Sequence, residues 1–215
     1  SGVPQRVLVA ETGQSATFAS LPARTTLSAL ALVATGGTAW YVYQYQHDYL
    51  TDTTVLMERN FFGVLRVQET GQGVGRTRSL VHGVILHGKQ SFDPEFRRKP
   101  TTYYTEKSGV GLAFAAFSKA PLRAGVIGLG AGTLASYGRR GDVIRFYDIN
   151  PRVIDVAKTE FTYLSDSPAK IENVLGDARL SMERETPQHY DILVVDAFSS
   201  DAIPVHLITL AACRA

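Results

Sequence analysis

The sequence has only one cysteine, Cys213, among its 215 residues. A single cysteine cannot close a disulfide within the chain and offers only one thiolate to a metal cluster. No charge of either sign is in large excess, because 22 basic residues face 20 acidic ones and the net charge is +2. The densest basic stretch, Arg97-Arg98-Lys99, is short and precedes Pro100, which is typical of a solvated loop. We therefore predict no metal, no nucleic-acid partner and no need for an oxidising compartment.

Charged residues are absent from residues 25–46. This stretch is long enough to cross a bilayer as a helix, and Trp40 with the tyrosines that follow it resembles an aromatic belt at a membrane interface. Its threonines, its glutamines and Gly36-Gly37 favour a different interpretation. The alternative is a buried helix over residues 26–35, a break at the two glycines, and a strand over residues 38–45. Both interpretations stay open from the sequence.

The start of the chain has no basic segment followed by an apolar core, so we expect no conventional signal peptide. We expect a cytoplasmic protein, which associates with a membrane through residues 25–46 if that stretch is membrane-bound.

Residues 54–100 have the pattern of a small antiparallel β domain. Short β-prone runs over residues 61–68, 77–82 and 84–87 are separated by glycine-containing turns. The sequence thus divides into an N-terminal segment, residues 1–53, this β domain, and a nucleoside-binding α/β domain over residues 101–215. The last of these begins with an apolar helix expected over residues 108–119.

Two histidines of the β region, His82 and His87, are five residues apart. Successive side chains of one strand point to opposite faces, so this odd spacing predicts that the two rings lie on opposite faces. We interpret both as surface or rim residues.

The stretch that organises the α/β domain is a glycine turn. An apolar run over residues 124–127 leads into Gly128, Gly130 and Gly132, a helix is expected next, and a β-branched and aromatic run ends at Asp148. Strand, glycine turn, helix, strand and acid form the first half of a nucleotide-binding βαβ unit. Gly128 permits a tight turn, Gly130 lets the backbone approach a ligand closely, and Asp148 can accept hydrogen bonds from ribose hydroxyls. The alternative is a glycine turn that binds nothing.

Two later strands also end on acids. Asn150 and Pro151 have the pattern of a helix N-cap and first helical residue, with the helix running to about residue 163. Strands are then expected over residues 171–177 and 190–195, which end on or directly before Asp177 and Asp196. Helices are expected over residues 178–184 and 203–212.

Parallel strands present their carboxyl ends at one edge of the sheet, where ligands bind. Asp177 and the backbone after it, at Ala178, suit the adenine side of a ligand, and Asp196 lies nearest the reacting end. Each acid alone is equally explained as a helix N-cap. Acids at the third and fourth strands, with Thr133 in place of the third glycine of a dinucleotide fingerprint, favour an adenosyl sulfonium over a nicotinamide cofactor.

These motifs resemble the spermidine synthase (polyamine aminopropyltransferase) family, in particular a bacterial branch often fused to a membrane domain. The resemblance extends over roughly residues 57–210. It is carried by the segments 59–67, 86–90, 100–114, 128–158, 175–178 and 190–204. It implies a methyltransferase-like Rossmann domain after a small antiparallel β domain. It also implies aminopropyl transfer from decarboxylated S-adenosylmethionine to a di- or polyamine such as putrescine.

The resemblance also assigns site residues. Asp148 matches the family's ribose-binding acid and Asp177 its adenine-side acid. Asp196 matches the aspartate that accepts the amine proton, and Asp201 the second aspartate of that loop, although the spacing here is longer. Tyr104 and Gln90 match the residues that line the propylamine channel.

Two departures from the family keep other functions open. Residues 98–102 are basic and then neutral where the family has an acidic pair, which weakens the case for a dicationic acceptor. The family's sheet also continues beyond its fourth strand, so we expect residues 190–195 to form an apolar edge. Either the chain is a fragment of a longer sheet, or a homodimer partner, another chain or residues 38–45 cover that edge. The alternatives are a small-molecule methyltransferase that uses S-adenosylmethionine, and a degenerate nucleoside-binding module.

Overall fold

The computed structural model of the chain describes residues 20–117 and 121–197. The chain divides into two compact units, Ser1–Thr51 and Asp52–Ala215. Asp201 and the helix expected over residues 203–212 lie outside the described residues.

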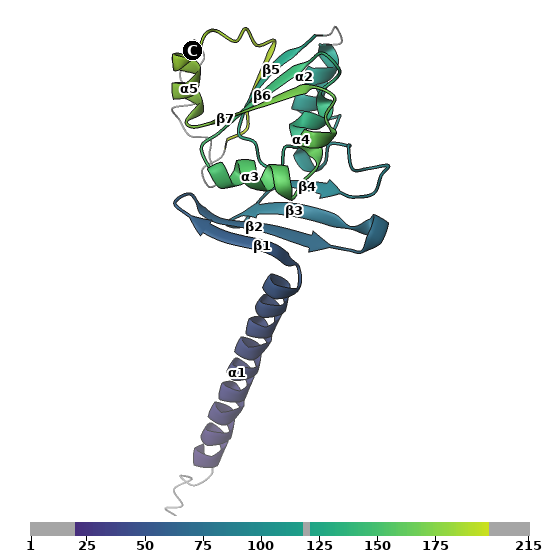
Figure 1. Cartoon of the computed structure of the whole chain (residues 1–215). Helices are drawn as coiled ribbons and strands as arrows, with labels where there is room; N and C mark the ends of the chain where they lie inside the picture. The colour runs from purple at the N-terminus through teal and green to yellow at the C-terminus, as the bar shows by residue number, and fades with distance from the viewer. Residues whose placement is uncertain (1–19, 118–120, 198–215) are drawn as a thin grey trace, which may run out of the picture. The chain divides into compact units, whose positions relative to one another are not determined.

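Helix α1 (Ser20–Asp52) is one continuous helix (Figure 1). The predicted break at Gly36-Gly37 and the strand over residues 38–45 are therefore wrong. A glycine costs a helix only about 1 kcal/mol, and the neighbouring alanines and leucines are strong helix formers. Thr38 Oγ1 also donates to the Ala34 carbonyl at 2.8 Å across the two glycines.

The prediction that this helix is buried is also wrong, because its large apolar side chains are exposed. Leu32, Val33 and Tyr41 keep 74%, 73% and 69% of their surface exposed. Within the described residues, no helix combines the length and the apolar character needed to cross a membrane.

The second unit contains an antiparallel sheet in the order β1-β2-β3-β4. Its strands are β1 (Thr54–Asn60), β2 (Gly63–Thr70), β3 (Thr77–His82) and β4 (Ile85–Ser91). The antiparallel β region is confirmed, but Phe61 and Phe62 form the turn between β1 and β2 instead of starting a strand. Leu65, Val67 and Leu80 point from this sheet into the core that it shares with the α/β part.

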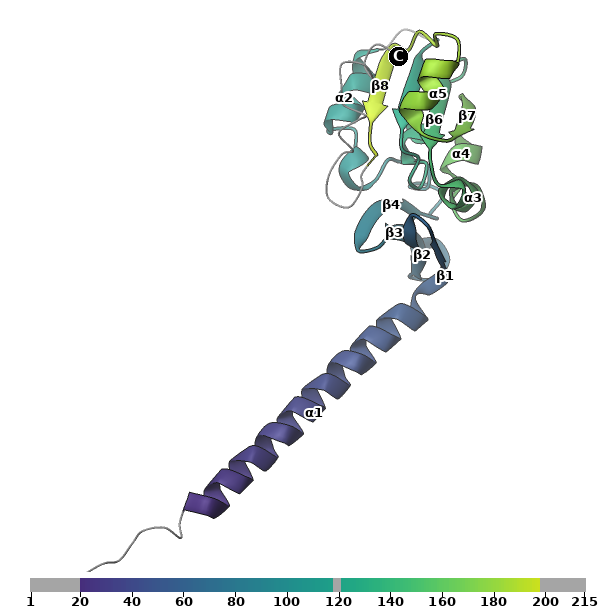
Figure 2. The ribbon, with the colours of Figure 1, turned by 90° about the vertical axis from the view of Figure 1, so that its left-hand side faces the viewer.

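A parallel sheet in the order β7-β6-β5-β8 confirms the predicted Rossmann-like fold. Its strands are β5 (Arg123–Ile127), β6 (Val143–Asp148), β7 (Lys170–Leu175) and β8 (Ile192–Val195). Helices α2 and α5 lie on opposite sides of this sheet (Figure 2). The helices of this unit are α2 (Gly109–Ala116), α3 (Pro151–Thr159), α4 (Tyr163–Asp166) and α5 (Ala178–Arg184), with 3-10 turns η1 (Gly73–Gly75), η2 (Thr102–Tyr104) and η3 (Thr133–Tyr137).

Capping side chains begin both α3 and α5. Asn150 Oδ1 accepts from the Arg152 N–H at 3.0 Å, with Pro151 as the first residue of α3. Asp177 Oδ1 accepts from the Leu180 N–H at 2.9 Å at the start of α5. Both predicted helix starts are confirmed, whereas α3 ends at Thr159, earlier than expected.

The helix expected after the glycine turn is replaced by the short turn η3. A side chain at Gly138 would place its Cβ 2.5 Å from Ala169 Cβ, and Gly141 has a φ of +94°. The chain thus packs tightly against the loop after α4 and then reverses direction into β6. The helical turn ends at Gly138, whose backbone is extended, with φ of −66° and ψ of 137°.

Asp142 stabilises the start of the parallel sheet and offers a first test. Its buried carboxylate accepts from the Leu122 N–H at 2.8 Å and from the Arg139 N–H at 2.9 Å. Burial alone would raise the pKa of Asp142, but these hydrogen bonds and the Arg139 guanidinium outweigh it and hold the pKa below the usual range. We expect Asp142→Asn to cost about 2 kcal/mol in urea unfolding, because a buried donor loses its charged partner.

The pH dependence follows from the lowered pKa. Asp142 contributes its stability fully above its unfolded-state pKa of about 3.9, and the contribution is lost as pH falls through the folded-state value. The gap between wild type and Asp142→Asn should therefore shrink below about pH 4. Asp191→Asn is the matched control, because Asp191 makes a similar bond to the Arg123 N–H at 2.8 Å but is exposed. An equal loss in both variants would contradict this account.

Candidate functional site

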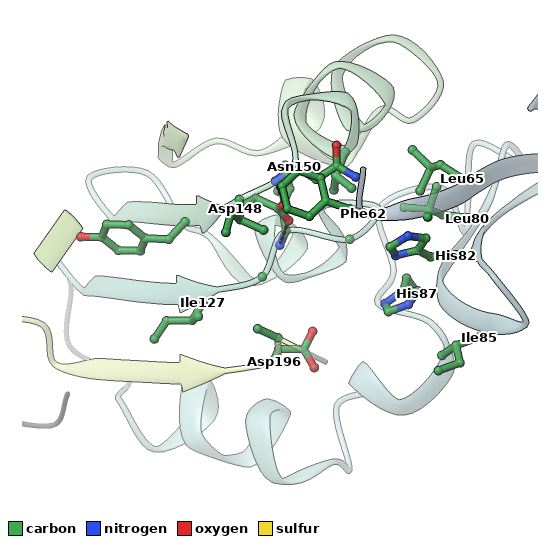
Figure 3. Close-up of a pocket in the computed structure, with 18 of the residues that line it drawn as sticks. Phe62, Leu65, Leu80, His82, Ile85, His87, Ile127, Asp148, Asn150 and Asp196 are labelled. Carbon is green, nitrogen blue, oxygen red and sulfur yellow. Dashed lines mark hydrogen bonds between the residues drawn. The ribbon is translucent and has the colours of Figure 1, made fainter. Parts of the chain in front are cut away.

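A cavity of about 620 Å³ lies between the carboxyl ends of the parallel strands and the antiparallel sheet (Figure 3). Its position follows from the strand order. The chain moves from β5 outward to β6 and β7, and then returns to the other side of β5 as β8. Ligands of open α/β sheets bind at such a switch point. The lining includes six of the residues expected at the site: Gly128, Gly130, Asp148, Asp177, Ala178 and Asp196.

The glycines of the turn are required by close packing. Gly128 has a φ of +97°, and a Cβ there would lie 2.7 Å from the Asp196 carbonyl oxygen. Gly130 has a φ of +53°, and its Cβ would lie 2.6 Å from the His87 carbonyl oxygen. The close approach at Gly130 is thus to strand β4. Gly132 lies outside the cavity lining, where its Cβ would meet Leu164 Cδ2 at 2.8 Å.

Asp148 is oriented by the backbone on both sides of it. Its Oδ2 accepts from the Leu129 N–H at 3.0 Å, and its Oδ1 accepts from the Asn150 N–H at 2.9 Å. Burial raises the pKa of this carboxyl, although the two N–H groups and the nearby His82 oppose the rise. The carboxylate therefore lies beside the glycine turn in a fixed orientation. Its role as a ribose ligand remains a prediction.

Asp196 follows β8 and is paired with Tyr104. The Tyr104 hydroxyl donates a hydrogen bond to Asp196 Oδ2, and the Tyr103 oxygen lies 3.1 Å from the Tyr104 oxygen. Burial raises the pKa of Asp196 to about 6, against the opposing effect of the Tyr104 hydrogen bond. Burial and the adjacent carboxylate raise the pKa of Tyr104, so its phenol stays protonated at neutral pH. The pair combines a carboxyl that titrates near neutrality with a fixed donor.

Gln90 has a structural position outside the cavity lining. It is fully buried, and its Nε2 donates to the Arg97 carbonyl and to Thr162 Oγ1, both at 2.8 Å. Its Oε1 accepts from the Thr162 N–H at 2.9 Å. The amide thus ties β4 to the start of α4.

The basic stretch before Tyr104 forms ion pairs with acidic residues of the chain itself. Arg97 Nε lies 2.8 Å from Asp166 Oδ2, and Lys99 Nζ lies 3.9 Å from Glu95 Oε1. Neither Arg97 nor Lys99 is among the residues that line the cavity. This basic stretch replaces the family's acidic pair, but the positive charges of Arg97 and Lys99 lie outside the cavity lining.

The sequence prediction missed the two histidines of the site. The rings of His82 and His87 lie 5.8 Å apart between centroids, and both line the cavity. The expectation of opposite faces is wrong because the two residues belong to different strands. His82 pairs with Ile85 across the hairpin, and His87 follows Ile85 by two residues, which returns it to the same face. The turn at Gly83 is the sequence signal that could have indicated this.

Comparisons with known proteins give the fold. No family model and no curated protein sequence matches the chain. The crystal structure of spermidine synthase from Thermotoga maritima is similar with a TM-score of 0.50 and 15% identity, covering 73% of this chain and 50% of that chain. A probable spermidine synthase from Corynebacterium glutamicum ATCC 13032 gives 0.55 and 17%, covering 73% and 55%. The chain thus spans about half the length of these two proteins, and within that span it shares the fold of spermidine synthases.

Proposed function

We propose that this protein transfers an aminopropyl group from decarboxylated S-adenosylmethionine to a di- or polyamine. The observation that carries the proposal is the Asp196–Tyr104 pair at the carboxyl end of β8, next to the glycine turn. A buried carboxyl with a pKa of about 6 can bind an ammonium group and then take its proton.

The chemistry needs such a group. An alkylamine is mostly protonated at neutral pH and must lose a proton before its nitrogen can attack. The neutral nitrogen forms a bond to the terminal carbon of the propyl group attached to sulfur, and the carbon–sulfur bond breaks. The electron pair of that bond returns to sulfur and gives neutral methylthioadenosine. Because the sulfonium is already activated, positioning and charge complementarity supply most of the remaining catalysis.

The charge of the cavity supports a cationic ligand. Its described lining carries the carboxyls of Asp148, Asp177 and Asp196 but no lysine or arginine. A sulfonium and an ammonium are favoured in such surroundings. The carboxylate of S-adenosylmethionine itself would find no basic partner among these lining residues, which favours the decarboxylated form over the methyl donor.

Binding and product formation test the proposal separately. Isothermal titration with methylthioadenosine, S-adenosylmethionine and its decarboxylated form should give weaker binding of the carboxylated ligand, and incubation with putrescine should yield spermidine. Tighter binding of S-adenosylmethionine without aminopropyl product would favour the methyltransferase alternative. No binding of any of the three would favour a degenerate module.

The pH profile gives an independent prediction. Below pH 6 Asp196 becomes protonated and neutral, so it can neither hold an ammonium nor accept its proton. We expect kcat/KM for aminopropyl transfer to fall about tenfold per pH unit below about pH 6. An acidic limb near 4, the ordinary range of an aspartate, would contradict this assignment.

We also propose that, as in the membrane-fused bacterial branch of the family, the protein is cytoplasmic and associates with a membrane through α1. Its exposed aliphatic and aromatic side chains support the proposal, and the region has no charge from residue 25 to residue 46. Flotation with vesicles of phosphatidylcholine and phosphatidylglycerol should carry the full chain but not a variant with Trp40, Tyr41 and Val42 replaced by glutamine. Concentration-dependent dimers without flotation would instead indicate a second copy as the partner.

A further inference from the structure

Two imidazole rings lie on the antiparallel-sheet side of the cavity. His82 from β3 and His87 from β4 lie next to one another, while Asp148 and Asp196 lie on the parallel-sheet side (Figure 3). Within residues 20–117 and 121–197, no hydrogen bond engages a ring nitrogen of either histidine. Both rings therefore present polar atoms to the cavity that the rest of this region does not use.

Glycines fix the positions of both histidines. A Cβ on Gly63 would lie 2.8 Å from His82 Nε2, so the missing side chain makes room for this ring. Gly63 also has a φ of +126°, which side-chain-bearing residues rarely adopt. The His87 backbone packs against Gly130 of the glycine turn. The imidazole pair is thus held over the place where a nucleoside would lie.

Of the two rings, His82 is the one placed so that a positive charge on it would lower the pKa of the Asp148 carboxyl. Ionised Asp148 can only accept hydrogen bonds, and each of its oxygens already accepts one backbone N–H. A sugar hydroxyl that donates to Asp148 still has an acceptor oxygen. A neutral imidazole can donate to that oxygen through its N–H group.

We propose that His82 is a specificity-determining residue that binds, together with Asp148, the vicinal sugar hydroxyls of the ligand. This assignment rests on the adenosyl ligand of the proposed function. Burial, and to a lesser degree His82, lower the pKa of His87. His87 therefore adds no positive charge near neutral pH to a cavity that has to accept a sulfonium.

The test compares two ligands on matched variants of the full chain. The probes are methylthioadenosine and its 2′,3′-dideoxy analogue, titrated into wild type, His82→Phe and His87→Phe. We expect His82→Phe to lower the affinity for methylthioadenosine about tenfold, as for the loss of one good hydrogen bond. The affinity for the dideoxy analogue should stay unchanged. His87→Phe should change the affinities for both ligands by the same factor. His82→Asn, which keeps a side-chain donor, should recover part of the loss.

Several outcomes would overturn the assignment. Equal loss of both ligands in His82→Phe would indicate a packing role, and no loss of either would remove His82 from the site. Because a variant can lose its fold, the wild type supplies a second measurement. Removing the two hydroxyls must weaken binding to wild type more than to His82→Phe, and an equal effect on both proteins would contradict the proposal.

Failure of the proposed function remains distinguishable from failure of this assignment. Wild type that binds methylthioadenosine but yields no spermidine would refute aminopropyl transfer, while the four affinities would still decide the role of His82. Wild type that binds neither nucleoside would overturn the adenosyl site and the assignment of His82 with it.

Discussion

Asp196→Asn should lower kcat/KM for aminopropyl transfer by about 10³-fold and leave methylthioadenosine affinity within about twofold. An amide cannot take the proton of an ammonium at any pH near neutrality, and it lacks the negative charge that holds a cationic acceptor. The neutral product has no positive charge, so its affinity does not depend on that carboxylate.

The substitution should leave the fold intact. The Asp196 backbone N–H donates to the Ile127 carbonyl at 2.8 Å, and this bond does not involve the side chain. An asparagine oxygen can still accept from the Tyr104 hydroxyl. Circular dichroism and thermal unfolding of Asp196→Asn should therefore match wild type. A parallel loss of methylthioadenosine binding would instead indicate that Asp196 shapes the cavity.

Tyr104→Phe is the informative companion variant. The Tyr104 hydrogen bond lowers the pKa of Asp196, so its removal should move the acidic limb of the pH profile above pH 6. At pH 8, where the carboxyl remains ionised, the loss in kcat/KM should be only about tenfold, because one positioning hydrogen bond is missing. An unchanged acidic limb would show that the limb belongs to another group. Asp155→Asn, on the exposed face of α3, controls for the loss of a negative charge elsewhere.

The parts of the fold that depend on local interactions could be predicted from the sequence. Asn150 before Pro151, and Asp177 before Ala178, carry their capping groups within three residues of the N–H groups that they bind. An apolar run before the glycine turn predicted strand β5, and runs ending on or near Asp148, Asp177 and Asp196 predicted β6, β7 and β8 and the edge of the sheet at which these acids gather. Each of these patterns needs no knowledge of distant residues.

The parts that depend on distant partners could not be read from patterns in the residues alone. Tyr104 and Asp196 meet although they are 92 positions apart, and only the family resemblance suggested that they share a site. The His82–His87 pair depends on how β3 and β4 fold onto each other. The position of Gln90 depends on Thr162, the residue before α4, which is 72 positions away.

Helix α1 and turn η3 show why the predicted helix boundaries near glycines were wrong. A break was predicted at Gly36-Gly37, where α1 continues, and a full helix was predicted where only the short turn η3 forms. A Cβ added to Gly36 or Gly37 would have no heavy atom within 4 Å, so nothing opposes a continuous helix there. Gly138 is packed tightly against Ala169, and the loop that contains Ala169 lies far along the chain. The same residue type therefore permits a helix in one place and accompanies its early end in the other, according to tertiary contacts.

Gly128→Ala should be the most destabilising of the single substitutions considered for this chain, by about 3–4 kcal/mol in urea unfolding. Two costs add. The φ of +97° is unfavourable for any side-chain-bearing residue, and the new Cβ would lie 2.7 Å from the Asp196 carbonyl oxygen and 3.0 Å from its carbon. Because these are backbone atoms, the contact can be relieved only by moving the end of β8 or the glycine turn.

Gly141→Ala separates the two costs. Gly141 has nearly the same φ, +94°, but no heavy atom lies within 4 Å of its added Cβ. We expect it to lose only the conformational part, about 1–2 kcal/mol, and to keep full nucleoside affinity. Gly128→Ala should also lower the affinity for methylthioadenosine, because the displaced backbone includes Asp196, which lines the cavity. Equal destabilisation of the two variants would mean that the glycine turn adapts to the side chain, and that packing against Asp196 does not determine the residue at this position.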